Sequence, residues 1–176
     1  TLTGFACHPT VLDGDNAQIT SDWVGTFYEH MEAAIPGEHL FLQGGVGGWI
    51  QPKTPERSFE LAATYGNDLG AKVLAALKTT APLSGTDVRF ANTVFAVAND
   101  NPGFKQLSEM GVLPRGIGDT VETEVAWFAV GDAQFATHPG ETAPAYTFAT
   151  KEMMDSGPKF ILGIGLDHLG YIVKPE

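Results

Sequence analysis

The chain has 176 residues, of which 43% are apolar and 18% are charged, which fits one domain with a hydrophobic core and excludes a disordered or coiled-coil chain. Its formal net charge of −11 argues against a nucleic-acid partner, because so acidic a surface repels phosphate backbones. The single cysteine, Cys7, excludes an internal disulfide and a cysteine-rich zinc site, and no apolar run is long enough for a transmembrane segment.

The first part of the chain predicts a strand, a helix and a second strand. Residues 2–7 are apolar enough for a core strand, and Ser21 is predicted to cap a helix that ends near Ile35. Residues 39–43 predict a short strand that runs into a glycine-rich loop. The helix residues predicted to be buried are Trp23, Phe27, Met31 and Ala34, and the histidines predicted to be exposed are His30 and His39.

A long helix and a long strand are predicted next. Thr54, followed by a proline, predicts the start of a helix that ends near Lys78, because proline is favoured at the first helical position. Residues 86–97 predict a strand, and residues 99–118, rich in Asn, Pro and Gly, predict a loop. The side chains predicted to be buried here are Phe59, Leu69, Val73, Leu77, Phe90, Val94 and Phe95.

The last part of the chain predicts a hairpin, a helix and a final strand. Residues 120–130 alternate between apolar and polar side chains, and Gly131-Asp132 predicts a two-residue turn into residues 133–138. A helix is predicted from about 142 to 155, and an apolar strand follows it. Strands that alternate with helices predict an α/β or α+β fold, with a layered mixed sheet and flanking helices.

In such folds, binding sites gather where strands end and helices begin. Four segments meet this description: residues 8–20, 44–53, 137–143 and 167–172. The polar and glycine residues that they carry are His8, Gly44, Gly45, Gly47, Gly48, His138, Glu141, Asp167, His168 and Tyr171. We therefore predict that these residues lie close together.

His8 and Glu141 are the strongest candidates for binding a metal ion. His8 follows a strand, and a neutral imidazole is the commonest metal ligand near neutral pH. Glu141 follows a His-Pro-Gly corner ahead of the predicted helix, whose N-terminus favours an ionised carboxylate. Each residue also has a purely structural interpretation, as a loop histidine bonded to backbone and as a helix N-terminal carboxylate.

The glycine loop and the tail supply further candidates. The GGVGG run at 44–48 allows backbone to approach a ligand and to present N–H groups to an oxyanion, or forms only a packed turn. His138 and His168 are candidates for acid catalysis or for orienting the site. Tyr171 is a candidate for metal binding or proton donation, or is a core tyrosine.

The motifs FACHPT, FLQGGVGGWIQP, GDAQFATHPGE and GIGLDHLGYIVKP occur in the order seen in neutral/alkaline, non-lysosomal ceramidases. The chain resembles the later part of that family's catalytic domain over nearly its whole length. The resemblance implies a zinc-dependent hydrolase acting on the amide of a lipid-like acyl substrate, in a secreted or periplasmic location. It implies His8, Glu141 and Tyr171 as zinc ligands, a further histidine on an upstream segment, and residues 44–48 beside the scissile carbonyl.

Two other functions stay open from the sequence. The family's glycine loop carries Asp or Asn near Gly48, and its catalytic serine region is shortened here around 53–56, so the chain is alternatively a non-catalytic binding module that retains the fold. Thr1 is alternatively an N-terminal nucleophile with its own amine as base. The abrupt start inside a predicted core strand predicts instead that an upstream segment of the same protein precedes it.

Overall fold

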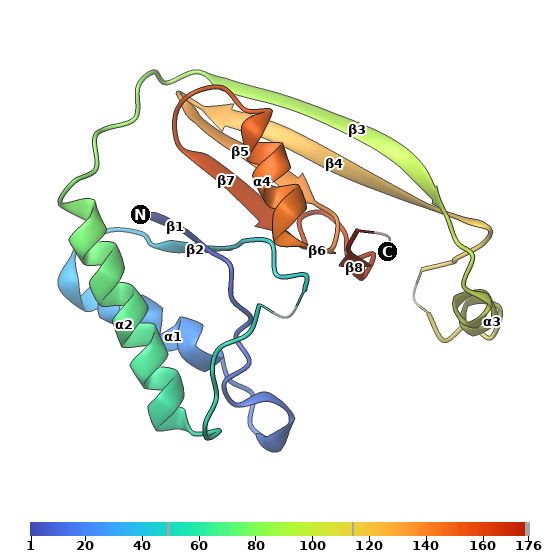
Figure 1. Ribbon diagram of the computed structural model, residues 1–176, viewed down its shortest axis with the longest axis horizontal. Helices are drawn as coiled ribbons and strands as arrows, with labels where there is room; N and C mark the ends of the chain where they lie inside the picture. The colour runs from blue at the N-terminus through green and yellow to red at the C-terminus, as the bar shows by residue number, and fades with distance from the viewer. Residues whose placement is uncertain (49, 114, 175–176) are drawn as a thin grey trace.

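The computed structural model describes residues 1–48, 50–113 and 115–174 (Figure 1). Helices and strands alternate along the chain, as the sequence predicts. In chain order the helices are α1 (Asp22–Ala34), α2 (Phe59–Leu77), α3 (Pro102–Glu109) and α4 (Pro144–Glu152), with a 3-10 turn at Asp13–Asp15. The strands are β1 (Leu2–Phe5), β2 (Leu40–Gln43), β3 (Val88–Ala98), β4 (Thr120–Val130), β5 (Ala133–His138), β6 (Glu141–Thr142), β7 (Lys159–Gly163) and β8 (Tyr171–Ile172).

The strands form three sheets among the described residues. The largest has the order β3-β4-β5-β7, in which β3–β4 and β4–β5 are antiparallel and β5–β7 is parallel. The predicted turn at Gly131-Asp132 is confirmed, because Val130 pairs with Ala133 across it. β1 pairs with β2 and β6 pairs with β8, both in parallel. The prediction of a mixed sheet with flanking helices is therefore confirmed.

The largest sheet is covered on one face by α4 (Figure 1). On that face Ala136, Ile161 and Met154 form a buried cluster, with Trp127 packed against it. The next residue along a strand points to the opposite face, so Phe135 lies on the other side of the sheet from Ala136.

The opposite face of the sheet carries three stacked aromatic rings. Phe128 stacks on Phe135 with ring centroids 4.5 Å apart, and Phe135 stacks on Phe160 at 4.9 Å. These residues are in register across β4, β5 and β7. β1 passes close to this face, since a Cβ on Gly4 would lie 3.1 Å from the Phe160 ring. The β1–β2 pair therefore forms the next layer, and α1 and α2 lie beyond it (Figure 1).

The two N-terminal helices pack against each other through small residues of α2. The predicted α1 face is confirmed for Trp23, Phe27 and Met31, which are buried, whereas Ala34 is exposed. On α2 the buried residues are Ala62, Gly66 and Gly70, and the predicted Leu69, Val73 and Leu77 are only partly buried, with Phe59 47% exposed. A Cβ on Gly66 would lie 2.7 Å from the backbone nitrogen of Phe27, so only glycine allows this approach of the helices.

Two predictions of helix and loop are wrong. Helix α2 begins at Phe59, because the Ser58 hydroxyl caps it by accepting from the Leu61 N–H at 3.1 Å, and Thr54 lies in the preceding loop. Residues 99–118 contain helix α3, which the composition concealed. Asn101 caps α3 by accepting from the Gly103 N–H at 2.9 Å, with a proline at the first helical position.

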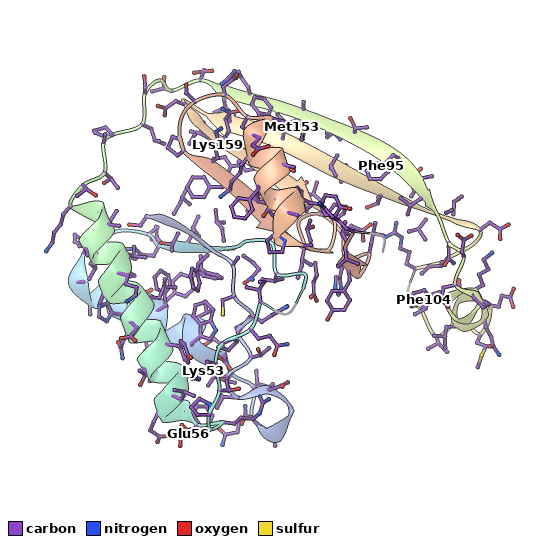
Figure 2. All side chains as sticks on the ribbon, in the orientation of Figure 1. Lys53, Glu56, Phe95, Phe104, Met153 and Lys159 are labelled. Atoms are coloured by element: carbon purple, nitrogen blue, oxygen red, sulfur yellow. The ribbon has the colours of Figure 1, made fainter. Side chains whose placement is uncertain are left out.

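The burial predicted for β3 is also wrong. Phe90 is 67% exposed, Val94 55% and Phe95 37%, because among the described residues no helix or second sheet packs extensively on the faces of β3, whose main contact is its neighbour β4. Figure 2 shows Phe95 on the long strand pair β3–β4, and Phe104 on α3. His39, predicted to be exposed, is buried, with its Nε2 3.3 Å from the Ile35 carbonyl oxygen. No helix within the described ranges is long and apolar enough to cross a membrane.

Candidate functional site

His8 lies just beyond the end of β1, and its backbone is held by two other segments. Its N–H donates to the Ile50 carbonyl at 3.0 Å, and its carbonyl accepts from the Trp23 indole N–H at 3.0 Å. Trp23 is itself buried in the cluster formed by α1, α2 and the loop after His8. The position of His8 is therefore determined by core packing and by the glycine-loop segment.

Asp22 organises the loop that follows His8. Its carboxylate is buried and accepts from the backbone N–H groups of Val11 at 3.2 Å, Leu12 at 2.9 Å and Trp23 at 2.8 Å. Its backbone is left-handed, with φ 53°. Ser21, the predicted cap of this helix, makes no side-chain capping bond, and no sequence pattern indicated the role of Asp22.

We expect Asp22→Ala to lower the free energy of unfolding by about 2–4 kcal/mol, because it leaves buried N–H donors without an acceptor. The left-handed backbone adds to the loss for alanine, whereas asparagine tolerates that conformation and retains one acceptor oxygen. Asp22→Asn should therefore lose about half as much or less. Chemical denaturation of both variants measures the difference. Equal stability of Asp22→Ala and the wild type would contradict the role given to Asp22.

Glu141 lies in the two-residue strand β6, three residues before the start of α4, rather than at the helix terminus itself. The tail of the chain runs alongside it. The Glu141 N–H donates to the Gly170 carbonyl at 2.9 Å, and the Leu169 N–H donates to the Pro139 carbonyl at 2.9 Å. Glu141 is the register partner of Tyr171 in the β6–β8 pair, which places the two side chains on the same face.

The Glu141 carboxylate lies between two imidazoles. Its Oε2 is 3.3 Å from His8 Nε2, and its Oε1 is 3.9 Å from His168 Nε2. The side chains of His8 and Glu141 are only 18% and 15% exposed, whereas that of His168 is 60% exposed. Oε2 is fully buried, and its contact with His8 lacks the geometry of a hydrogen bond. A buried carboxylate oxygen without a hydrogen bond is costly unless a cation is supplied.

The glycine loop packs directly on β6. The Gly47 N–H donates to the Thr142 carbonyl at 3.1 Å, and a Cβ on Gly47 would lie 2.7 Å from the Thr142 carbonyl carbon. A Cβ on Gly45 would lie 2.9 Å from the same carbonyl oxygen, and the Gly44 N–H donates to Phe5 at 3.3 Å. Gly48 is exposed, with φ 89° and open space around it. The loop thus supports the backbone of Glu141, and its predicted contact with substrate stays a prediction.

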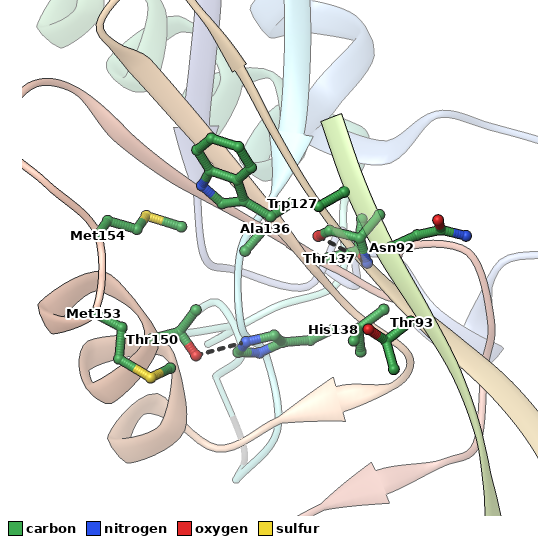
Figure 3. Close-up of a pocket in the computed structure, with 12 residues that line it drawn as sticks. Asn92, Thr93, Trp127, Ala136, Thr137, His138, Thr150, Met153 and Met154 are labelled. Carbon is green, nitrogen blue, oxygen red and sulfur yellow. Dashed lines mark hydrogen bonds between the residues drawn. The ribbon is translucent and has the colours of Figure 1, made fainter. Parts of the chain in front are cut away.

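His138 faces a different part of the molecule. Its Nε2 is 3.0 Å from the Thr150 hydroxyl of α4, in a cavity of about 380 Å³ beside Trp127 and Met153 (Figure 3). Burial lowers the pKa of the imidazole below its usual value, so the ring is neutral at pH 7. His138 has no hydrogen bond or ion pair with His8, Glu141 or His168. Its predicted catalytic role stays a prediction.

Asp167 begins the tail segment and is held by Arg115, which sequence reasoning missed. Arg115 Nη1 donates to both carboxylate oxygens at 2.9 and 2.8 Å, and the Thr123 hydroxyl donates at 2.7 Å. The Arg115 guanidinium holds the pKa of Asp167 below its usual range, so the carboxylate is ionised at neutral pH. Arg115 lies in a stretch predicted to be an unstructured loop, where no sequence signal linked it to the tail.

The structure therefore brings together His8, Glu141, His168, Tyr171 and the glycine loop from four segments that are far apart in sequence. Tyr171 is 69% exposed. A cavity of about 620 Å³ borders this cluster at His168 and Gly170, and its apolar walls include Phe104 and Leu113. In the described part of the chain, no three His, Cys, Asp or Glu side chains form a group that could hold a metal by themselves. A metal here would need the tyrosine or a ligand from elsewhere.

The structure matches solved structures over nearly its whole length. A neutral ceramidase from Pseudomonas aeruginosa superposes with a TM-score of 0.69 over 97% of this chain, at 15% sequence identity. The fold is ceramidase-like. A second structure, described as a ceramidase complexed with C2, superposes with a TM-score of 0.68, also at 15% identity and over 97% of this chain.

The chain spans only part of those proteins, 38% of the first and 39% of the second. No protein-family model matches the sequence, and a search of curated proteins finds no match. At 15% identity, the likeness establishes a shared fold between this chain and the matching part of those proteins.

Proposed function

We propose that the protein hydrolyses an amide or ester bond at a zinc ion held by His8, Glu141 and Tyr171. The observation that carries the proposal is the buried Oε2 of Glu141, which has no hydrogen bond and lies 3.3 Å from His8 Nε2. A buried carboxylate oxygen is destabilising unless a cation lies beside it, and a metal ion bound between Glu141 and His8 would supply that cation. The fold shared with structures described as ceramidases supports the hydrolase part of the proposal, and the zinc and its ligands rest on the site alone.

The donor atoms suit zinc. An imidazole nitrogen and a carboxylate oxygen are common zinc ligands, and catalytic zinc sites leave one position for water or substrate. Tyr171 would supply a phenolic oxygen from the strand paired with Glu141. When bound, zinc lowers the pKa of a water molecule to about 7 and polarises a carbonyl group. A further ligand from an upstream segment of the same protein would complete the set.

The other residues of the cluster would serve the reaction around that site. His168 is exposed and lies near Glu141, so it can exchange a proton between bulk water and the leaving group. The cavity of about 620 Å³ beside His168 would hold the apolar part of a lipid-like acyl substrate. The segment from Gly44 to Gly48 would support β6 behind the carboxylate.

The proposal is tested by elemental analysis of the purified protein, together with hydrolysis assays on a panel of N-acyl amides and esters. We expect about one zinc per chain, lost on dialysis against a chelator together with activity. Activity that persists in chelated protein would contradict a metal-dependent hydrolase. The variant Glu152→Gln, at the exposed end of α4, is the control and should retain as much zinc and activity through purification as the wild type.

A binding module without catalysis is the second candidate. This candidate is favoured by the hydrogen bonds of the glycine loop. The Gly44 and Gly47 N–H groups already donate to the Phe5 and Thr142 carbonyls, so in this conformation they cannot donate to an oxyanion. This candidate predicts ligand binding without turnover of any member of the panel.

The Thr1 nucleophile stays a further prediction. The Thr1 amine is 2.6 Å from the Glu38 carbonyl oxygen, and Thr1 lies at the opposite end of β1 from His8. Adding one residue before Thr1 would abolish a reaction that uses its amine as the base. Unchanged hydrolysis in that extended protein would eliminate this alternative.

A further inference from the structure

The segment that carries His168 and Tyr171 is joined to β7 by an unusual backbone path. Ile164 has φ 56° and Leu166 has φ 71°, both left-handed, on either side of Gly165. A β-branched residue such as isoleucine rarely adopts this conformation, which persists only where surrounding contacts impose it. Contacts beyond this turn must therefore hold the segment in place.

The strongest such contacts converge on Asp167. Its carboxylate accepts two bonds from Arg115 and one from Thr123 of β4, and its Oδ1 also accepts from the His168 N–H at 2.8 Å. Arg115 is anchored in turn, because its Nη2 donates to the Glu122 carbonyl. The Asp167 side chain is only 18% exposed. This network fixes the backbone of His168 to β4.

The residues immediately after the network contact the segment around Glu141. His168 Nε2 approaches Glu141 Oε1, Leu169 donates to the Pro139 carbonyl, and the Gly170 carbonyl accepts from the Glu141 N–H. The His168 side chain is 60% exposed, and its Nε2 is 3.9 Å from Glu141 Oε1, too far for a hydrogen bond. Its position therefore depends on its backbone, which the Asp167 network holds.

We propose that Arg115 and Asp167 are positioning residues, whose ion pair holds His168 and Tyr171 beside Glu141. That His168 and Tyr171 serve a metal site rests on the proposed function. That Arg115 and Asp167 hold them in place rests on the contacts alone. Neither residue is a proposed metal ligand, but both line the cavity of about 620 Å³ proposed for the acyl group, so the positioning role is read from amide exchange and zinc affinity, which need no substrate. Asp167 acts through the backbone of His168, and Arg115 acts by holding Asp167.

The test compares Arg115→Ala with Arg89→Ala. Arg89 also pairs with an aspartate, Asp87 at 3.2 Å, but lies on β3 with its guanidinium over the Trp127 ring. The Glu141 N–H donates to the Gly170 carbonyl in the tail, and the Leu169 N–H in the tail donates to the Pro139 carbonyl. Hydrogen exchange of these two amides therefore reports whether the tail stays beside Glu141. We expect both amides to exchange at least about tenfold faster in Arg115→Ala, with no change in the β5 amides or in Arg89→Ala.

Zinc affinity gives the second readout. Changes to residues that orient metal ligands lower affinity by about 10–100-fold, and we expect a loss in this range for Arg115→Ala, with a smaller loss for Thr123→Val. A purely stabilising ion pair would instead lower the thermal midpoint and raise exchange throughout the sheet, which would overturn the inference. Unchanged exchange at Glu141 and Leu169, or unchanged affinity in a protein that binds zinc, would overturn it as well.

The two proposals fail in different ways. If the wild-type protein binds no zinc, the proposed metal site is wrong, and amide exchange alone decides whether Arg115 and Asp167 position the tail. If the wild type binds zinc and Arg115→Ala binds it equally well, the metal site stands and the positioning role is wrong. Asp167→Asn, which retains the size of the side chain but removes its charge, should reproduce the effect of Arg115→Ala.

Discussion

Replacing Glu141 by glutamine is expected to abolish zinc binding and hydrolysis while leaving the metal-free protein at least as stable. Loss of residues that only orient zinc ligands costs about 10–100-fold in affinity, so loss of a ligand should cost at least about 100-fold. The metal-free protein should gain up to about 1 kcal/mol, because Oε2 of Glu141 is buried without a hydrogen bond and glutamine removes its charge.

Loss of zinc binding together with unchanged or higher stability of the metal-free protein would distinguish a metal ligand from a carboxylate that only stabilises the fold. Zinc titration and chemical denaturation of Glu141→Gln, each with and without chelator, measure the two effects. Glu152→Gln makes the same chemical change at an exposed position and should alter neither property. If Glu141→Gln destabilises the metal-free protein by more than about 1 kcal/mol, the carboxylate has a structural partner and the metal site loses its main support.

The second large effect is expected for Gly47→Ala, which should lower the free energy of unfolding by about 3 kcal/mol. A Cβ on Gly47 would lie 2.7 Å from the Thr142 carbonyl carbon, and closer still to the Glu141 carbonyl. Because both contacts are with backbone, the loop and β6 must separate. In a protein of this size the thermal midpoint should fall by about 6–12 °C, and zinc affinity should fall with it.

Two other glycines provide the controls. Gly118→Ala adds a Cβ where no atom lies within 4 Å, so it should leave the thermal midpoint within about 2 °C of the wild type. Gly48→Ala meets open space but has φ 89°, so it should cost about 1–2 kcal/mol without displacing β6. If Gly47→Ala is as stable as Gly118→Ala, the loop does not support Glu141 as its packing indicates.

The agreement between sequence and structure is closest where local chemistry decides the outcome. The turn at Gly131-Asp132 and the buried stripe of α1 follow from residue types and periodicity within one segment. The prediction that His8, Glu141, His168 and the glycine loop meet also agrees with the geometry, because strand ends in a layered fold converge on one edge. His138 was also predicted to lie with them. Its position at the end of β5 instead directs its side chain toward α4, where it contacts the Thr150 hydroxyl.

The disagreements arise where long-range packing decides. Phe90 and Val94 have the pattern of core residues, yet burial depends on whether another element covers the strand, and β3 has only β4 beside it. The start of α2 is decided by which hydroxyl finds the free N–H groups, and Ser58 does so rather than Thr54. Helix α3 has only eight residues, too few for a clear period in the sequence.

The sequence by itself determined the alternation of helices and strands, the glycine loop and the candidate side chains that carry metal-binding donor atoms, because each depends on residue type and short-range spacing. Only the tertiary structure decided that the Glu141 carboxylate is buried between His8 and His168, and that Arg115 holds the tail through Asp167. These pairs are separated by 133, 27 and 52 residues, as 141 − 8, 168 − 141 and 167 − 115 give. Contacts of that range depend on how the layers pack, which no local pattern encodes.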